Sequence, residues 1–244
     1  MKTINLKEPI WVIGDVHGQL DALKNILSKI PENAKICFVG DLIDRGYQSK
    51  DVVNLVKDRE YFCVRGNHEE FMIDFNNAHS YPIWIRNGGV ETIHSYIELT
   101  KEILKKGFSG NTDITDNLNK NKDFLNHVKW MTELPVIIKF NIENEKPLYV
   151  SHSGLRLFET DTEILENNSE HEIVWNRSMK NEVDFAVNIH GHSIVPKDMI
   201  FVSKSQIDID TGAFLDNMYL RAGKAILTAI EYPSLKIIHS NLIS

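Results

Sequence analysis

Short apolar runs alternate with amphipathic stretches in the first third of the chain. Three uninterrupted apolar runs, at residues 10–13, 36–39 and 61–64, have the length and composition of strands buried on both faces. Each run is followed by a stretch in which apolar residues recur every three or four positions, as on one face of a helix. These stretches cover residues 20–30, 49–57 and 68–75. A β-α-β-α-β-α order of this kind predicts a parallel sheet whose strands are joined by helical crossovers.

The pattern changes at residue 79. Residues 79–131 have mostly helical periodicity, interrupted by a polar segment at 109–122 for which we expect a loop. Strand-like segments follow at 136–140, 147–150, 185–189, 199–202, 206–209, 224–230 and 235–238, and the last two suggest a hairpin. We therefore expect a mixed α/β (α+β) fold with two packed sheets covered by helices. Residues 1–244 would form one domain, with 79–131 as a mainly helical insertion near the functional site.

Composition and charge narrow the class of protein without identifying it. With 244 residues, 42% apolar and 25% charged, the chain matches an ordinary globular protein with a sizeable core. A net charge of −7 disfavours a nucleic-acid partner, which normally requires a basic face. Cys37 and Cys63 lie in apolar runs, where we expect reduced core thiols. No uncharged apolar stretch approaches the ~20 residues of a membrane span, so we expect a cytoplasmic protein without a membrane partner.

Polar clusters follow each of the first three predicted strands. Asp15 and His17 come after the first strand, Asp41 after the second, and Asn67 and His68 after the third. Asp15, Asp41 and Asn67 are spaced 26 residues apart. In open α/β sheets ligands bind beyond the carboxyl ends of the strands. Mixed carboxylate, imidazole and amide ligands at that edge suit divalent first-row metals.

Two later apolar runs also end in histidine beside glycine. These are His152, followed by Gly154, and the pair His190 and His192 on either side of Gly191. A single cluster of this type is more often a turn with a hydrogen-bonded core histidine than a metal site. Five such clusters at strand ends are not a pattern that core packing requires, and together they predict a two-metal site that cleaves phosphate esters.

The three leading clusters carry a family resemblance. Their motifs, GDxHG at 14–18, GDxxDRG at 40–46 and GNHE at 66–69, resemble those of metallophosphoesterases of the phosphoprotein phosphatase family. The runs WIRNGG at 84–89 and DTGA at 210–213 make the chain most similar to the compact bacterial and lambda-phage-type serine/threonine phosphatases. The resemblance implies a four-layer β-sandwich flanked by helices. It also implies a dinuclear centre of two divalent ions, most often manganese, with iron or zinc as alternatives.

The resemblance also implies the metal ligands. It assigns Asp15, His17 and Asp41 to the first ion, and Asp41, Asn67, His152 and His192 to the second, so that Asp41 bridges the two. His190 is the competing candidate for the last position. We favour His192, because the family's ligand follows the glycine and precedes a hydroxyl residue, here Ser193.

The same resemblance implies a mechanism. Two ions acidify a bridging water, and the hydroxide attacks phosphorus in line. Arg45, Asn67 and Arg177 would bind the phosphate, with the two guanidinium groups acting as forks. His68 would protonate the leaving alkoxide, and Asp44 would orient its imidazole.

The substrate class is the least determined part of the prediction. We expect a serine/threonine protein phosphatase acting on a phosphoprotein or phosphopeptide, as a monomer. Symmetrical diadenosine tetraphosphate hydrolases share the metal set but typically carry Ala at the position of Asp44 and Asp at that of Glu69. Nucleases of the wider superfamily are disfavoured by the acidic charge, and a non-catalytic binding module by the complete ligand set. Selectivity would depend on residues 79–131 and 161–172, which can rim a shallow site.

Overall fold

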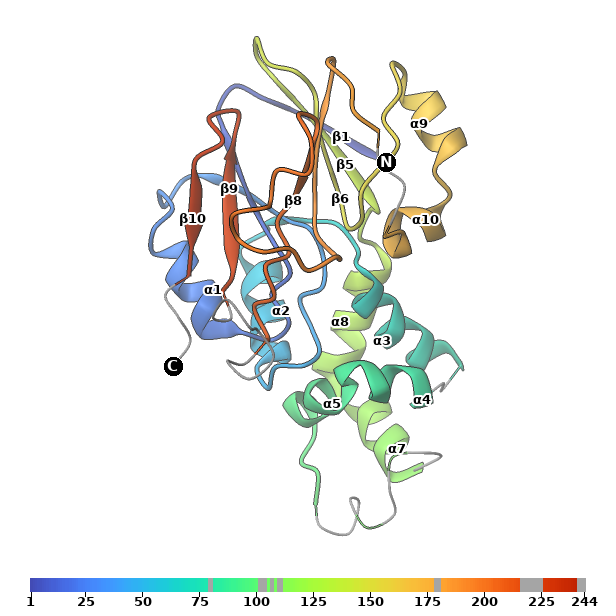
Figure 1. Cartoon of the computed structure of the whole chain (residues 1–244). Coiled ribbons are helices and arrows are strands. Elements are labelled where there is room, and N and C mark those ends of the chain that lie inside the picture. Colours follow the sequence, from blue (N-terminus) through green and yellow to red (C-terminus); the bar gives the residue numbers. More distant parts are fainter. Residues whose placement is uncertain are drawn as a thin grey trace.

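The computed structural model describes residues 1–78, 81–100, 105, 108, 112–177, 181–215 and 226–240. Its strands form two five-stranded sheets (Figure 1). The first has the order β10-β9-β2-β3-β4 and contains Ile10–Ile13 (β2), Lys35–Phe38 (β3), Phe62–Cys63 (β4), Thr228–Tyr232 (β9) and Ile237–His239 (β10). The second has the order β1-β5-β6-β7-β8 and contains Lys2–Leu6 (β1), Ile137–Ile142 (β5), Leu148–Ser151 (β6), Val187–His190 (β7) and Gln206–Asp208 (β8).

The β2-β3-β4 half of the first sheet has the predicted parallel arrangement. Ile10 pairs with Lys35 and Cys37 with Phe62, both in parallel register. The crossovers are the helices Leu20–Leu27 (α1) and Ser49–Asp58 (α2). The predicted closing hairpin is also present, since β9 and β10 pair antiparallel and β9 continues the sheet beside β2. The carboxyl ends of three parallel strands therefore meet at one edge.

The second sheet departs from the sequence prediction in two places. Residues 2–6 form β1, a strand that we had not predicted, paired in parallel with β5. The strand predicted at 199–202 is wrong. Met199 N–H donates to the carbonyl of Pro196 in a turn, and only Phe201 makes an isolated bridge, to Ile207. Apolar character had suggested a strand, but the Met199 and Phe201 side chains are 64% and 48% exposed.

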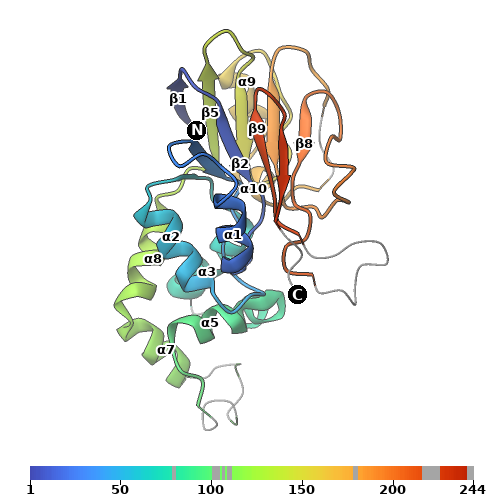
Figure 2. The ribbon, with the colours of Figure 1, turned by 90° about the vertical axis from the view of Figure 1, so that its left-hand side faces the viewer.

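The sheets pack face to face and helices cover both outer faces, as predicted for a four-layer sandwich (Figure 2). Alternate residues of facing strands form the layer between the sheets, for example Val12 of β2 and Val150 of β6. The opposite face of β2 and β3, with Trp11 and Phe38, packs against α1 and α2. The helices Asp161–Asn167 (α9) and Glu170–Trp175 (α10) cover the second sheet. Alternation along each strand thus decides which layer a side chain enters.

The described residues of the 79–131 segment are largely helical and lie beyond one end of the sandwich (Figure 1). The elements are Tyr81–Trp84 (α4), the π-helical turn Ile85–Gly89 (η1), Val90–Tyr96 (α5), Thr112–Lys120 (α7) and Lys122–Thr132 (α8), next to Asn67–Ala78 (α3). The loop predicted at 109–122 is wrong where the structure describes it, because α7 begins at Thr112; residues 109–111 lie outside the described residues. Ile114 and Leu118, four positions apart, are fully buried on one face of α7. Their burial stabilises a helix here although most residues of the segment are polar. Across the described residues, no helix is long and apolar enough to span a bilayer.

Candidate metal centre and phosphate site

The predicted residues lie on loops at the carboxyl ends of strands from both sheets. Asp15 and His17 follow β2, Asp41 follows β3, and Asn67 and His68 begin α3 just after β4. The other two loops, after β6 and β7, carry His152 and His192. Of the eight described non-glycine residues with positive φ, five belong to these loops: His17, Asp41, Asp44, Arg45 and His192. Backbone strain of this kind costs free energy and concentrates where side chains must be aimed.

Glycines beside the site give the chain room to approach. A Cβ on Gly66 would collide with the Asp41 carboxylate, and one on Gly191 would collide with that of Asp15. Both positions are therefore limited to glycine by close packing against a candidate ligand, which explains why the polar clusters carry glycine.

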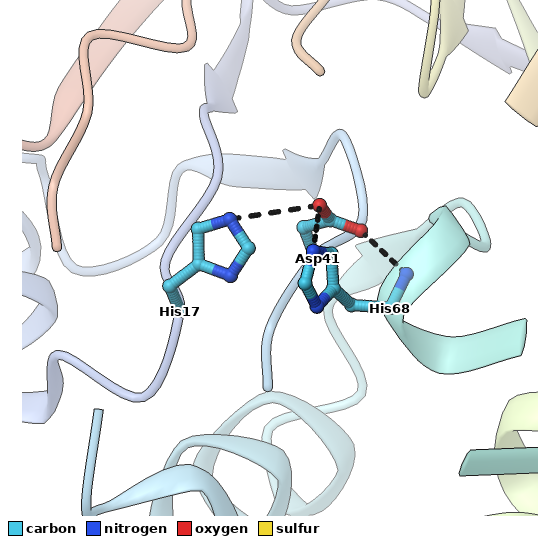
Figure 3. Close-up of side chains that lie close together, drawn as sticks. All are labelled: His17, Asp41 and His68. Atoms are coloured by element: carbon cyan, nitrogen blue, oxygen red, sulfur yellow. Dashed lines mark hydrogen bonds and ion pairs between the residues drawn. The ribbon is translucent and has the colours of Figure 1, made fainter. Parts of the chain in front are cut away.

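Asp41 lies at the centre of the site. Its Oδ2 atom is 3.6 Å from His17 Nε2 and 3.8 Å from His68 Nε2, and its Oδ1 accepts the backbone N–H of His68 at 3.0 Å (Figure 3). On the other side, Asp41 Oδ1 is 3.4 Å from His152 Nε2. Burial alone would raise the pKa of Asp41, but His152, His68, His17 and His192 together lower it. The carboxylate is therefore an anion placed between two groups of nitrogen atoms.

The tautomers of three histidines follow from their backbone partners. A carbonyl oxygen can only accept, so the ring nitrogens facing the Val39, Ile43 and Trp175 carbonyls must carry the protons. In His152 and His17 that nitrogen is Nδ1, and in His192 it is Nε2. The opposite nitrogen of each ring then presents a lone pair to the site. Burial is the largest cause that lowers the pKa of all three rings, that of His192 to about 3.

Three acceptors converge beside Asp41 as a result. Asn67 Oδ1 lies 2.9 Å from both His152 Nε2 and His192 Nδ1, and these two nitrogens are 3.1 Å apart. Neutral acceptors at this distance repel one another unless a cation lies among them. Imidazole nitrogens held by backbone acceptors on their far side are the usual arrangement around a protein-bound metal. The donor set therefore fits a divalent first-row ion.

A second group of acceptors lies on the other side of Asp41. Ligand atoms of His17, Asp41 and His68 lie within 4.8 Å of one another, and so do those of Asp15, Asp41 and His152. Asp15 accepts the backbone N–H of His192 at 3.2 Å. Burial, followed by the charges of Asp210, Asp41 and Asp208, raises the pKa of Asp15 well above its usual value. The positive charge of a bound cation would offset the repulsion among these buried carboxylates.

His192 and His190, the two candidates for the last ligand position, have different contacts in the structure. His192 reaches Asn67 and His152, whereas the His190 ring is directed to the Gly191 carbonyl, at 3.2 Å from Nδ1, and to Asp208, at 3.6 Å. Both are buried. The structure thus places His192, and not His190, beside Asn67 and His152.

Both predicted arginines line a cavity of about 190 Å³ over Asp41 and Asn67. Arg45 Nη1 donates to His17 Nε2 at 2.9 Å, and Nη2 lies 3.1 Å from His68 Nε2. Arg177 Nη1 donates to the His192 carbonyl at 2.9 Å. The two guanidinium groups therefore approach the same small space from different loops.

His68 and Asp44 form the predicted pair. His68 Nδ1 donates to Asp44 Oδ2 at 2.6 Å, and both side chains are buried. Burial alone would lower the pKa of His68, but the charge of Asp41 and the hydrogen bond and charge of Asp44 raise it. The imidazole is thus a better proton carrier than a buried histidine without partners.

Several residues that shape the site had no predicted structural role. Glu69 accepts the backbone N–H groups of Asp41, Leu42 and Gly66 at 2.8 Å each, and so ties two ligand loops together. The Phe214 ring lies 4.0 Å from the Arg45 guanidinium carbon. Glu69 lies within a recognised motif, whereas Phe214 directly follows the DTGA run and had no signal of its own.

Comparison with known proteins places the chain in a family. A family model described as calcineurin-like phosphoesterase matches residues 8–209. The chain is 36% identical over 83 residues to Serine/threonine-protein phosphatase 1 of Salmonella typhimurium, and 35% identical over 83 residues to Serine/threonine-protein phosphatase 2 of Escherichia coli. Each match covers 33% of this chain and only 38% of the relative.

The fold is also similar to that of solved structures. A crystal structure of a protein provisionally described as a diadenosine tetraphosphatase aligns with a TM-score of 0.59 and 17% identity, covering 98% of this chain and 96% of the other. At that identity the likeness concerns the fold alone. Because the family model extends over most of the sequence, the chain belongs to the calcineurin-like phosphoesterase family.

Proposed function

We propose that this protein is a metal-dependent serine/threonine protein phosphatase that hydrolyses phosphomonoesters. The observation that carries the proposal is the meeting of lone pairs from Asn67, His152 and His192 within 3.1 Å beside the buried Asp41 carboxylate. An acceptor cluster of this kind, with guanidinium groups facing it, suits a bound cation and an anionic substrate.

In this proposal each ion would have its own ligands, and Asp41 would contribute to both sites. Asp15 and His17 would complete the first site, and Asn67, His152 and His192 the second, with manganese as the expected metal. When bound, the ions supply positive charge to the phosphate oxygens and lower the pKa of a water molecule. The chain itself holds the ligands in place through the backbone acceptors of Val39, Ile43 and Trp175.

The chain's own residues would bind the phosphate and move a proton. Arg45 and Arg177 would hold phosphate oxygens in the cavity that they line. Asn67 would contribute its amide to the same group. His68 would donate a proton to the departing alkoxide from Nε2, while Asp44 holds its Nδ1–H at 2.6 Å.

The choice of a protein substrate rests on two residues and on the relatives' names. Asp44 and Glu69 stand where the diadenosine tetraphosphate hydrolases typically carry Ala and Asp, and here both make the buried contacts described above. The partial matches are to proteins named serine/threonine-protein phosphatase. Diadenosine tetraphosphate is the rival substrate, and a non-catalytic binding module is the rival outside enzymology.

The proposal is tested by turnover of two substrates on the manganese-loaded protein. We expect hydrolysis of a phosphoserine or phosphothreonine peptide to exceed hydrolysis of diadenosine tetraphosphate. The reverse preference would favour the nucleotide hydrolase, and no turnover of either substrate by a protein that retains two metal ions per chain would favour the binding module.

The role of His68 has its own test. The variant His68→Asn should lower turnover of an alkyl phosphate far more than turnover of p-nitrophenyl phosphate, because the phenolate needs little protonation. Equal losses on both substrates would remove His68 as the acid. His94→Asn is a matched control, since His94 lies on α5 against Tyr47 and outside the cavity lining.

A further inference from the structure

Asp44 is held by more donors than a histidine partner alone would require. Trp84 Nε1 donates to Oδ1 at 2.9 Å and also lies 3.1 Å from Oδ2. The Thr92 hydroxyl donates to Oδ1 at 2.7 Å, and His68 Nδ1 donates to Oδ2 at 2.6 Å. Asp44, Trp84 and Thr92 are all fully buried. Both oxygens of this carboxylate therefore accept hydrogen bonds from buried donors.

Two of these donors come from the helical segment after the GNHE motif. Trp84 ends α4 and Thr92 lies in the first turn of α5, 40 and 48 residues from Asp44 in the sequence. The π-helical turn η1 lies between them and contains Gly88, whose φ is 99°. Because this φ is not helical, the chain is kinked at Gly88 between the two donors.

The same turn also holds the residue after Asp44. The Gly88 carbonyl accepts the backbone N–H of Arg45 at 2.9 Å, and a Cβ on Gly88 would lie 2.7 Å from that nitrogen. Asp44 and Arg45 are adjacent non-glycine residues with φ of 72° and 68°. Such a pair persists only where surrounding contacts fix it, and residues 84–92 provide contacts to both.

We propose that Trp84 and Thr92 are positioning residues for the acid step: they hold the Asp44 carboxylate against His68 so that the imidazole points its Nε2 atom into the phosphate cavity. The inference rests on the proposed function, in which His68 protonates the leaving group. It assigns the 84–92 segment a role in aligning the proton donor, in addition to any role in rimming the site. The proton would pass from His68 Nε2–H to the alkoxide oxygen, while Asp44 accepts the hydrogen bond from His68 Nδ1.

The test compares leaving groups in Trp84→Phe and Thr92→Val. Both variants remove a donor to Asp44; Thr92→Val keeps the shape of the side chain, and Trp84→Phe keeps an aromatic ring. We expect turnover of a phosphoserine peptide to fall by about tenfold or more. Turnover of p-nitrophenyl phosphate should change by less than about threefold, because its leaving group needs no acid. Thr92→Ser, which keeps the hydroxyl, should restore peptide turnover, and bound metal should stay at the wild-type level.

Matched controls separate alignment from packing. Trp130→Phe and Thr132→Val make the same substitutions in and at the end of α8, away from the cavity lining. They should leave the ratio of the two turnover rates unchanged. If Trp84→Phe does not fold, Thr92→Val carries the test, since it removes a single hydroxyl.

The possible failures are distinguishable. Equal losses on both substrates in Trp84→Phe and Thr92→Val, or unchanged peptide turnover, would overturn the positioning role while His68→Asn still discriminates between the substrates. Equal losses in His68→Asn would refute the acid role and the inference with it. A wild-type protein that turns over neither substrate would refute the proposed function itself.

Discussion

Two buried histidine clusters in this molecule are built on opposite principles. In the helical region, His127 of α8 has one partner for each ring nitrogen: the Tyr96 hydroxyl lies 2.6 Å from Nδ1, and Asn54 Oδ1 lies 3.0 Å from Nε2. A single neutral tautomer, with the proton on Nε2, satisfies both contacts. At the candidate metal centre, the nitrogens of His152 and His192 that face the site meet each other and Asn67 Oδ1 with no proton available between them.

The difference shows how a site can be told from a hydrogen-bonded core histidine. In both clusters the histidine rings are buried and contact an asparagine amide, so burial of the rings and composition do not separate the clusters. The balance of hydrogen-bond donors and acceptors does separate the two clusters. The His127 cluster closes on itself, whereas the other has a surplus of lone pairs that a cation would satisfy.

The largest expected effect is on catalysis at the centre of the acceptor cluster. Asp41→Asn should lower phosphomonoester turnover by roughly a thousandfold or more, because the ions contribute several kcal/mol to the transition state. It should also reduce bound metal, measured by elemental analysis of the purified protein. A variant that is active with its full metal content would refute the bridging role of Asp41. Circular dichroism should show the fold retained.

The second effect concerns stability and separates the two clusters directly. Saturating Mn²⁺, at about 100 times its dissociation constant, should stabilise the wild-type protein by about 2.7 kcal/mol for each of the two ions. In a chain of this size each of these increments raises Tm by about 5–10 °C. His152→Ala should abolish the increment of the ion that it would hold, whereas His127→Ala should keep both increments and lower Tm both with and without metal.

The chelated proteins sharpen this contrast. In the presence of EDTA, His152→Ala should cost less stability than His127→Ala, since only the first removes one of several repelling acceptors. Equal costs in EDTA, together with an equal response of both variants to Mn²⁺, would contradict the distinction between the clusters.

The smallest effect is a pH dependence of the His127 cluster. Burial, followed by the charge of Lys57, lowers the pKa of His127 to about 4, against about 6.5 in an unfolded chain. Between these values the unfolded state binds more protons, so the free energy of unfolding falls as pH decreases from about 6.5 to 4. The loss should be at most about 3 kcal/mol. Urea denaturation in EDTA should show it in the wild type, and His127→Gln should show a smaller loss; identical pH profiles would contradict the assignment.

Much of the fold followed from local patterns. The continuous apolar runs of β2 and β3 and the stripes of α1 and α2 predicted a parallel sheet, because a strand buried on both faces has no polar alternation. Predictions failed where local composition and packing disagree. The polar segment containing α7 is helical because Ile114 and Leu118 are buried, and 199–202 is apolar but makes no strand.

The sequence by itself determined which side chains could meet at the site, since Asp15, Asp41 and Asn67 each follow one of three parallel strands of one sheet and such strand ends share an edge. Only the tertiary structure decided how they are held. His192, two residues beyond the end of β7, has a positive φ, and its ring, not that of His190, lies against Asn67. The tertiary structure also brought Trp84 and Thr92 to Asp44 from 40 and 48 positions away in the sequence. Periodicity records which face of its own element a residue occupies, but a hydrogen bond between distant loops depends on how the layers pack.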